Sequence, residues 1–195
     1  VFEALPVAGG MMAVGIPEYR LPRDILNVEI ENIKRAGVEI RLNTALGTDF
    51  TLDDLLPPSA SPQEPALSKV EGLGGTGGGY KAVILAVGAH KSRELGIEGE
   101  EMEGVYPGTQ FLRDIALGQA PDLRGKRVAV VGGGDVAIDA VRSAWRLNAA
   151  EVHLVYRRSR SDMPAHDDEV EGAEKEGIHF HFLTNPSRVI GNGKV

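Results

Sequence analysis

The chain has 195 residues, of which 42% are hydrophobic and 25% are charged, and this composition is that of an ordinary globular protein. Its net charge of -7 excludes a general nucleic-acid binder, because no basic surplus is available to neutralise phosphates. The absence of cysteine excludes disulfides, redox-active cysteine pairs and cysteine-ligated iron–sulfur or zinc sites within these residues. No apolar run approaches the ~18 residues that span a bilayer and no signal peptide is recognisable, so the expected location is cytoplasmic.

The first part of the chain combines glycine-rich loops with short regular elements. A glycine-punctuated loop over residues 9–17 precedes a predicted helix over 22–36. Period-two alternation predicts a strand over 38–42, and a threonine cap predicts a short helix over 51–56. Residues 57–79 hold four prolines and six glycines without hydrophobic periodicity, so we expect a disordered or loosely held insertion.

Strands and helices alternate in the rest of the chain. The predicted strands are 82–87, 127–131, 152–156 and 178–182, and the predicted helices are 111–117, 135–147 and 167–176. Alternation of this kind predicts an α/β fold made of parallel βαβ units, with helices on both faces of the sheet.

Both ends of the chain carry incomplete elements. Val1 to Glu3 has no initiating methionine and is typical of the last residues of a strand. Near the other end, Arg188 to Ile190 runs into Asn192-Gly193, which is a hairpin signal, and only Val195 remains of the returning strand. Because a hairpin with one arm buries little, we expect this chain to be part of a longer protein.

The stretch VAVVGGGDVAIDA, residues 128–140, fits the dinucleotide-binding fingerprint. In that pattern Gly132 permits the tight turn after the strand, Gly134 lets a pyrophosphate approach the backbone, and Ala137 lets the helix pack closely on the strand. The pyrophosphate then lies against the unpaired N–H groups of the helix N-terminus. The alternative interpretation is a plain turn between a strand and a helix.

The next predicted strand ends in Arg157-Arg158, where NAD-binding units place an acidic residue for the ribose hydroxyls. Two guanidinium groups suit the 2′-phosphate of NADP, which they can bind by charge-assisted hydrogen bonds. The sequence therefore favours NADP over NAD. The alternative is a solvated arginine pair at a strand end.

Three further features admit a structural explanation. His179 and His181 share one face of a strand, but a metal site needs more ligands and none is obvious nearby. Arg142 and Arg146, one helical turn apart, are most simply a solvated face and otherwise a contact for a negatively charged partner. The run from His166 to Glu169 places acidic residues at a helix N-terminus, where the helix dipole favours them.

Two sets of motifs together resemble one known family. The first set is VVGGGDVAIDAVRSA, VYRR, Met163-Pro164 and EVEGAEKEGIHF, all within residues 127–185. The second is GGMMAVGIPEYRLP over 9–22 and LAVGA over 85–89. Their order resembles the small (beta) subunit of glutamate synthase and related NADPH-dependent FAD oxidoreductases with two dinucleotide-binding domains. The resemblance covers nearly the whole chain outside the insertion.

The resemblance implies a pair of Rossmann-like domains, with the NADPH domain inserted into the FAD domain. Residues 1–110 would be a partial FAD-binding domain, and residues 111–195 an NADPH-binding domain truncated at its C-terminal hairpin. The family's first glycine fingerprint, its returning FAD segment and its cysteine-rich iron–sulfur region have no counterpart in this sequence. FAD is therefore expected only in the full-length protein.

The resemblance also assigns binding residues. In the FAD part, Glu3 would bind ribose hydroxyls, Gly10 and Met11 would touch the flavin nucleotide, Arg20 would pair with a phosphate, and Leu46 would lie by the adenine. In the NADPH part, the implied residues are Gly132, Gly133, Gly134, Asp135 and Val136 at the pyrophosphate and Arg157 and Arg158 at the 2′-phosphate. Met11 fits a core position equally well, and Asp135 fits a helix cap. No catalytic acid or base and no metal ligand is implied.

The function implied by the resemblance is electron transfer. NADPH would give hydride to FAD, and the electrons would pass on to iron–sulfur clusters of a partner or another domain. A flavin disulfide reductase fits poorly because the chain has no cysteine pair. Two other classes stay open: a regulatory module that binds NADP and transfers nothing, and an inactive truncated chain.

Overall fold

The computed structural model describes residues 1–56, 79–193 and 195. Contacts divide the chain into two compact units, and each is described by itself. The first comprises Val1–Gly10 and Asp24–Gly88, and the second comprises Met11–Arg23 and Ala89–Val195. Apart from Gly79, the predicted insertion lies outside the described residues. No helix in the described part of the chain is long and apolar enough to cross a membrane.

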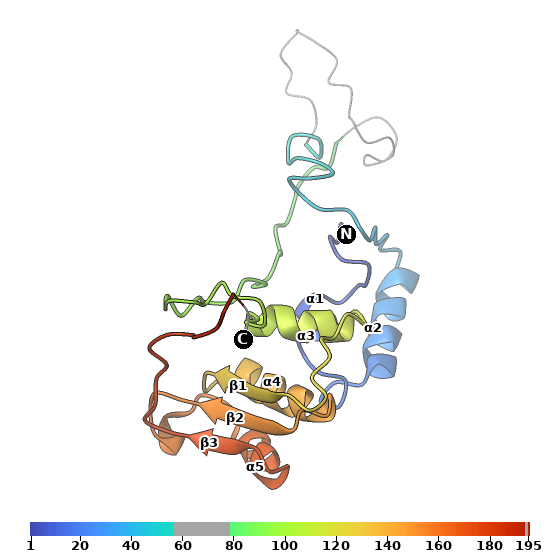
Figure 1. Cartoon of the computed structure of the whole chain (residues 1–195). Helices are drawn as coiled ribbons and strands as arrows, with labels where there is room; N and C mark the ends of the chain where they lie inside the picture. The colour runs from blue at the N-terminus through green and yellow to red at the C-terminus, as the bar shows by residue number, and fades with distance from the viewer. Residues whose placement is uncertain (57–78, 194) are drawn as a thin grey trace. The chain divides into compact units, whose positions relative to one another are not determined.

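The second unit contains the predicted alternation of strands and helices (Figure 1). Its elements are α3 (Gly108–Ala116), β1 (Arg127–Val131), α4 (Asp135–Arg146), β2 (Glu151–Val155), the 3-10 helix η1 (Arg160–Asp162), α5 (Asp167–Lys175) and β3 (His179–His181). Each strand and helix predicted from residue 111 onward is confirmed, with bounds that differ by no more than three residues. A short helix that was not predicted, α1 (Gly10–Val14), lies within the glycine-rich loop.

The three strands form one parallel sheet in the order β1-β2-β3, which confirms the α/β fold class. Arg127 is paired with Glu151, and His153 with His179. Because the strands are parallel, their carboxyl ends meet at one edge of the sheet. The glycine loop leaves β1 at that edge, and Arg157-Arg158 leaves β2 at the same edge.

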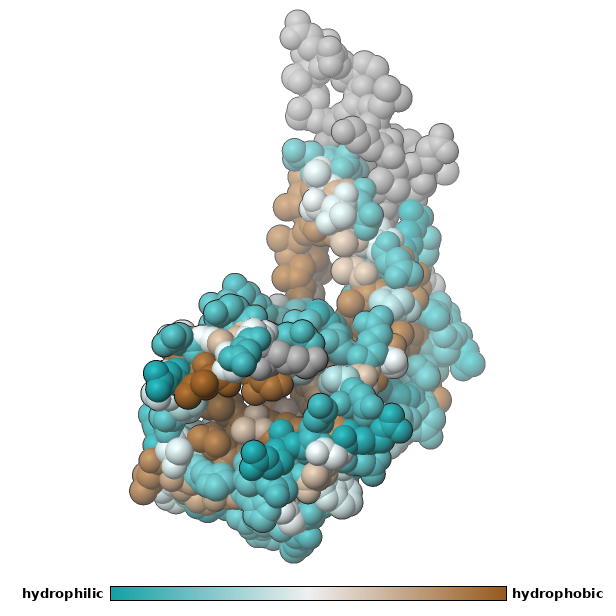
Figure 2. Space-filling model, viewed as in Figure 1, coloured by the Kyte–Doolittle hydropathy of each residue, from teal (hydrophilic) through white to brown (hydrophobic). Residues whose placement is uncertain are grey.

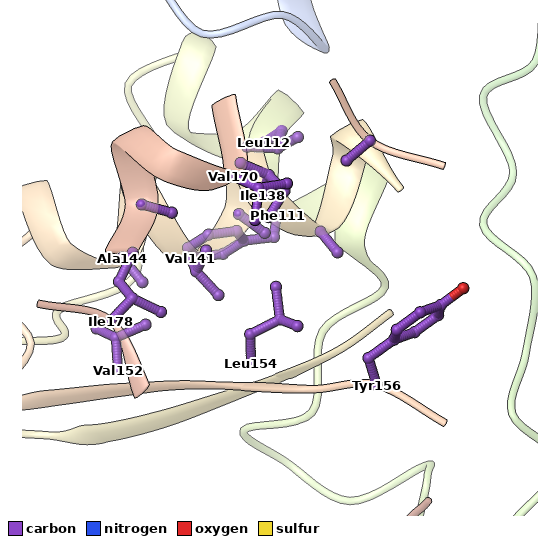
Figure 3. Packing of buried hydrophobic residues seen from close by; sticks show 14 residues of the cluster. Phe111, Leu112, Ile138, Val141, Ala144, Val152, Leu154, Tyr156, Val170 and Ile178 are labelled. Atoms are coloured by element: carbon purple, nitrogen blue, oxygen red, sulfur yellow. The ribbon is translucent and has the colours of Figure 1, made fainter. Parts of the chain in front are cut away.

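One face of this sheet carries the core. Helix α4 packs on β1 and β2 and also contacts α3 and α5. Ile138 from α4, Leu154 from β2 and Val170 from α5 have no exposed surface, and Figure 3 shows them converging. Burying a side chain of this size contributes about 1.5–3 kcal/mol relative to leaving it exposed.

The prediction of helices on both sheet faces is wrong for the described residues. The side chains of β1 and β2 on the core face are buried or half-buried, whereas Arg127, Ala129, Val131 and Glu151 on the other face are exposed. The helices α4 and α5 belong to one core cluster with the inward strand residues. The regular alternation of elements indicates parallel pairing, but it does not determine which face each helix covers.

The first unit has little regular structure besides α2 (Arg23–Arg35), which confirms the predicted helix over 22–36. Its small core is formed by Phe50 and Leu55, with Phe2 and Val83 packed against them. The rings of Phe2 and Phe50 lie 4.9 Å apart.

Two predicted strands and one predicted helix of this unit do not form. Residues 38–42 make a single bridge, between Phe2 and Arg41, and residues 82–87 pair with no described strand. Ile84 in that segment is 89% exposed, and Figure 2 shows the hydrophobic surface beside the grey residues. Residues 51–56 form only a turn, in which Asp54 accepts hydrogen bonds from the N–H and hydroxyl of Thr51. Residues 38–42 do lie beside the start of the chain: the N–H of Arg41 donates to the carbonyl of Val1 at 2.8 Å and the N–H of Glu3 to that of Arg41 at 2.9 Å, but this pairing is too short to make a strand. Residues 82–87 have no described strand for their backbone groups and stay irregular.

The predicted hairpin near the end of the chain is not formed by the described residues. Arg188 makes a parallel bridge with Glu98, and the backbone N–H of Val189 donates to the carbonyl of Glu98 at 2.8 Å. Val195 donates to the carbonyl of Glu103 at 2.9 Å. The segment therefore pairs with the loop after residue 96 and not with a returning arm.

Candidate functional site: the glycine loop and its surroundings

Gly132 makes the turn from β1 into the loop. Its φ of +147° is a conformation that side-chain-bearing residues rarely adopt, and its N–H donates to the carbonyl of Val155 at 3.0 Å. A Cβ at this position would lie 3.1 Å from the Cβ of Ala137. The small residue at 137 and the glycine at 132 therefore permit the close approach of α4 to the end of β1.

Gly133 packs against an aromatic ring that sequence reasoning did not identify. A Cβ here would lie 2.5–2.7 Å from three ring atoms of Tyr156, a nearly buried side chain seen in Figure 3. The Tyr156 hydroxyl donates to the backbone carbonyl of Asp162 at 2.8 Å, which fixes the ring. The carbonyl of Gly133 accepts from Ala165 at 3.2 Å. This glycine is thus required by packing within the protein.

Gly134 has no such packing reason to be glycine. It is the N-cap of α4 with φ -94° and ψ 175°, which any residue can adopt. A Cβ would have only the Pro164 Cγ within 4 Å, at 3.9 Å. The N–H groups from Gly133 to Val136 donate no hydrogen bond to the described residues. The loop therefore presents open space and unpaired donors at the positive end of a helix, an arrangement that suits a phosphate.

Two predicted residues line the first turn of α4. Val136 is 42% exposed, and its side chain lies beside Gly108 at the start of α3. The Asp135 carboxylate accepts hydrogen bonds from the backbone N–H of His166 at 3.3 Å and from its Nδ1 at 3.1 Å. The hydrogen bond and charge of Asp135 raise the pKa of His166, an effect to which Asp168 adds. Burial raises the pKa of Asp135, but its bonds with His166 outweigh this and lower it.

The pair formed by His166 and Asp135 predicts a pH-dependent contribution to stability. A raised pKa in the folded state means that the contribution is fully present below about pH 6.5, the value of a free histidine. It is lost as the pH rises through the higher folded pKa. The melting temperature of the wild type should therefore exceed that of His166→Gln most at about pH 6, and the difference should shrink at higher pH.

Melting curves across this pH range would test the pair. Asp135→Asn should remove the same pH dependence, because it removes the acceptor charge. His90→Gln is the matched control, since His90 forms no ion pair with the described residues. A constant difference between wild type and His166→Gln at all pH values would contradict the prediction.

Arg157 and Arg158 follow Tyr156, the first residue after β2, and both side chains are exposed. Neither guanidinium forms an ion pair with the part of the chain that the structure describes. Arg160, three positions along, differs because it is paired with Asp167 at 3.1 Å and with Glu174 at 3.4 Å. The two cations at the strand end are therefore available to an external anion.

The residues implied for FAD are divided between the two units. In the first unit, Glu3 accepts a hydrogen bond from the N–H of Leu5 at 2.9 Å, and Leu46 is 40% exposed beside Phe50. Gly10, at φ +54°, begins α1. In the second unit, Met11 is half-buried in α1 and its methyl group fills the space beside Gly15. The contacts that the Met11 side chain makes with the described residues are packing contacts.

Arg20 lies in the second unit and is held by two carboxylates. Its Nη1 lies 2.8 Å from Asp139 Oδ2, and its Nε lies 3.1 Å from Glu169 Oε1. Asp139 is only 3% exposed. Sequence reasoning named neither carboxylate as a partner of Arg20, although an aspartate in the middle of an otherwise apolar helix face is a signal for a buried ion pair.

The interpretation of Arg142 and Arg146 as a solvated face is wrong. Arg142 pairs with Glu169 and, at 2.9 Å, with Glu176, and Arg146 pairs with the same Glu176 at 2.9 Å. The ring of Tyr19 lies over both guanidinium groups, 4.8 Å and 4.0 Å from its centroid. These cations tie α4 to α5 and to the segment around Tyr19.

His179 and His181 have a third imidazole beside them. His153 Nδ1 lies 3.0 Å from His181 Nε2, and the rings of His153 and His179 stack at 5.1 Å. Within residues 1–56, 79–193 and 195, no group of three or more His, Cys, Asp or Glu side chains is arranged to hold a metal ion.

Comparisons with known proteins agree with the motifs. The chain is 52% identical over 192 residues to the NADP(+)-dependent formate dehydrogenase subunit beta of Moorella thermoacetica. It is 36% identical over 207 residues to the glutamate synthase [NADPH] small chain of Escherichia coli K12, which confirms the predicted resemblance. These alignments cover 97% and 100% of this chain, but only 24% and 39% of the two relatives.

A solved structure shares the fold. The protein FprA of Mycobacterium tuberculosis, solved in complex with NADPH, matches with a TM-score of 0.71 at 20% identity. The match covers 100% of this chain and 54% of FprA. Residues 63–195 match the family described as pyridine nucleotide-disulphide oxidoreductase. This range is more than half of the sequence and includes the glycine loop with β1 before it and α4 after it, so the chain belongs to the pyridine nucleotide-disulphide oxidoreductase family.

Proposed function

We propose that this chain is the NADP(H)-binding part of a flavoprotein oxidoreductase, together with a portion of its FAD-binding domain. Bound NADPH would supply a hydride to FAD, and the electrons would then pass to an iron–sulfur partner or domain. The protein's own residues bind and orient the cofactors, and we assign no catalytic acid or base. The proposed domains are residues 1–110 for FAD and 111–195 for NADPH.

The observation that carries the proposal is the open space at Gly134. The side of this residue where a Cβ would stand is free, its backbone conformation is ordinary, and the adjacent N–H groups have no acceptor among the described residues. A pyrophosphate at this place would accept from these donors and benefit from the dipole of α4. The residues that would hold it are Gly132, Gly133, Gly134, Asp135 and Val136.

The choice of NADP(H) over NAD(H) rests on Arg157 and Arg158. Both cations are exposed and without an ion pair in the described part of the chain, at the strand end where the adenosine ribose lies in nucleotide-binding βαβ units. Guanidinium groups bind a phosphate in bidentate geometry, and they give little advantage to a free 2′-hydroxyl. Two relatives carry NADP in their names, which is consistent with this choice.

For FAD, the proposal relies on the resemblance and on the residues that it implies. Glu3, Gly10, Met11, Arg20 and Leu46 are the proposed flavin contacts. The iron–sulfur partner rests on the same basis. The chain itself holds no cysteine and so supplies no thiol that could receive electrons.

The proposal predicts a flavin that NADPH reduces. The protein expressed from its full coding sequence should purify with the visible absorbance of oxidised flavin, and anaerobic NADPH should bleach that absorbance faster than NADH at equal concentration. Stabilisation by NADP without any flavin would instead indicate a regulatory module. At about 100 times its dissociation constant, NADP should stabilise the fold by roughly 2.7 kcal/mol. If the protein folds cooperatively but carries no flavin and is not stabilised by NADP, the chain is inactive.

A further inference from the structure

Arg20 is held in one orientation from two sides. Its Nη1 donates to both carboxylate oxygens of Asp139, at 3.0 and 2.8 Å, and its Nε lies 3.1 Å from Glu169 Oε1. Asp139 comes from α4 and Glu169 from α5, so two separate helices grip one guanidinium. The Arg20 side chain itself is 21% exposed. It is thus held by two carboxylates and still partly exposed to solvent.

The segment that carries Arg20 is also fixed. The N–H groups of Arg20 and Leu21 both donate to the carbonyl of Pro17 at 3.0 Å, which closes a turn. The neighbouring Tyr19 stacks on Arg142 and Arg146 of α4. Backbone and side-chain contacts therefore place Arg20 before any ligand binds.

A guanidinium has five N–H donors. Here Nη1 donates to Asp139, and Nε forms an ion pair with Glu169. The Nη2 group donates no hydrogen bond to the described residues. An arginine that is already oriented loses little further side-chain entropy when it binds an anion. The remaining donors of Arg20 therefore form a prepared contact for one anionic group.

Arg20 belongs to a cluster of charged side chains. Burial raises the pKa of Asp139, and the hydrogen bond and charge of Arg20 oppose that rise. The cluster contains three guanidinium groups, of Arg20, Arg142 and Arg146, and three carboxylates, of Asp139, Glu169 and Glu176. Asp135 also acts on Arg20, so the carboxylates around this arginine hold it without an added anion. Its Nη2 group keeps its donors free of the described residues.

We propose that Asp139 and Glu169 are positioning residues that orient Arg20, so that its Nη2 group binds a phosphate of a bound dinucleotide. The inference rests on the proposed function, and it links that phosphate to α4, the helix whose N-terminus carries the glycine loop. The phosphate belongs to FAD if Arg20 acts as the resemblance implies, and to NADPH otherwise.

Equilibrium binding of FAD and of NADPH to the protein expressed from its full coding sequence tests this proposal. Arg20→Gln should raise the dissociation constant of FAD about tenfold, the loss of one charge-assisted hydrogen bond. Asp139→Asn and Glu169→Gln keep the side-chain shapes and should raise the same constant, by a smaller factor. Glu171→Gln is the matched control, because Glu171 lies on α5 and pairs with Lys175 on the same helix.

A double-mutant cycle separates positioning from a general structural role. If Asp139 acts through Arg20, the double variant Arg20→Gln/Asp139→Asn should bind FAD no more weakly than Arg20→Gln alone. Additive losses would overturn the proposal, and so would unchanged constants for both nucleotides in a folded Arg20→Gln protein. A loss in NADPH affinity with FAD unchanged would support positioning and identify NADPH as the source of the phosphate. Failure of the wild type to bind either nucleotide would instead refute the proposed function.

Discussion

Replacing Arg157 and Arg158 together by alanine should raise the dissociation constant for NADPH about 30-fold or more and leave that for NADH nearly unchanged. A hydrogen bond to a charged group contributes about 1.5–3 kcal/mol, and exposure to solvent reduces this. Two such contacts to one phosphate then amount to about 2–3 kcal/mol, and 1.4 kcal/mol corresponds to a factor of ten. NADH lacks the 2′-phosphate, so it loses only a weak long-range attraction.

The preference ratio between the two nucleotides is the quantity to measure, because a general loss of folding would affect both equally. Arg124→Ala is a suitable control. Arg124 is also exposed, but it is paired with Asp122 and lies before β1, at the opposite edge of the sheet from Arg157 and Arg158. A double variant that keeps the wild-type preference for NADPH would show that these arginines bind something else or nothing.

The nucleotide-binding unit was predictable because its signals are local. An apolar strand, a glycine turn and an amphipathic helix follow one another without a gap from Val128 onward, and each satisfies its backbone groups with near neighbours. The same approach was wrong for residues 38–42, which pair with the start of the chain through one bridge only, and for residues 82–87, which pair with no described strand. A periodic pattern indicates what a segment can bury, and only a neighbouring segment turns it into a strand.

The charge cluster on α4 was not predictable in the same way. Arg20 and Asp139 are 119 positions apart, and no spacing rule relates them. Reading α4 alone leaves Arg142 and Arg146 as an exposed basic face, because their partners come from α5 and from the segment around Tyr19. The sequence therefore indicates where a nucleotide binds more readily than it indicates which charges hold the surrounding segments in place.

The resemblance places Gly133 and Gly134 alike at the pyrophosphate, but the structure gives the two glycines different surroundings. Gly133 has a structural reason to lack a side chain, since a Cβ would lie 2.5 Å from the Tyr156 ring. Gly134 has no comparable reason in the protein, since its nearest neighbour would be 3.9 Å away. The two positions therefore distinguish what the fold needs from what a ligand needs.

Gly133→Ala should destabilise the fold by about 1–3 kcal/mol, the usual cost of forcing an added methyl into a packed site. Tyr156 cannot move away cheaply, because its ring is buried and its hydroxyl is hydrogen-bonded to the Asp162 carbonyl. For a chain of this size the melting temperature should fall by about 2–4 °C per kcal/mol. Nucleotide binding should fall as well, since the loop has to shift.

Gly134→Ala should weaken nucleotide binding more than it lowers the stability of the fold. Alanine is a poorer N-cap than glycine by about 0.5–1 kcal/mol, so the melting temperature without ligand should fall by only about 1–4 °C. Its methyl group would stand in the open space beside the unpaired N–H groups, and the dissociation constant for NADPH should rise about tenfold or more. Calorimetric titration with NADPH and thermal melting of both variants give the four values needed. If Gly134→Ala binds NADPH as tightly as the wild type, no pyrophosphate approaches this backbone, and the nucleotide site must be sought elsewhere. If it is as unstable as Gly133→Ala, the glycine at 134 serves the fold, and its open surroundings no longer support a ligand.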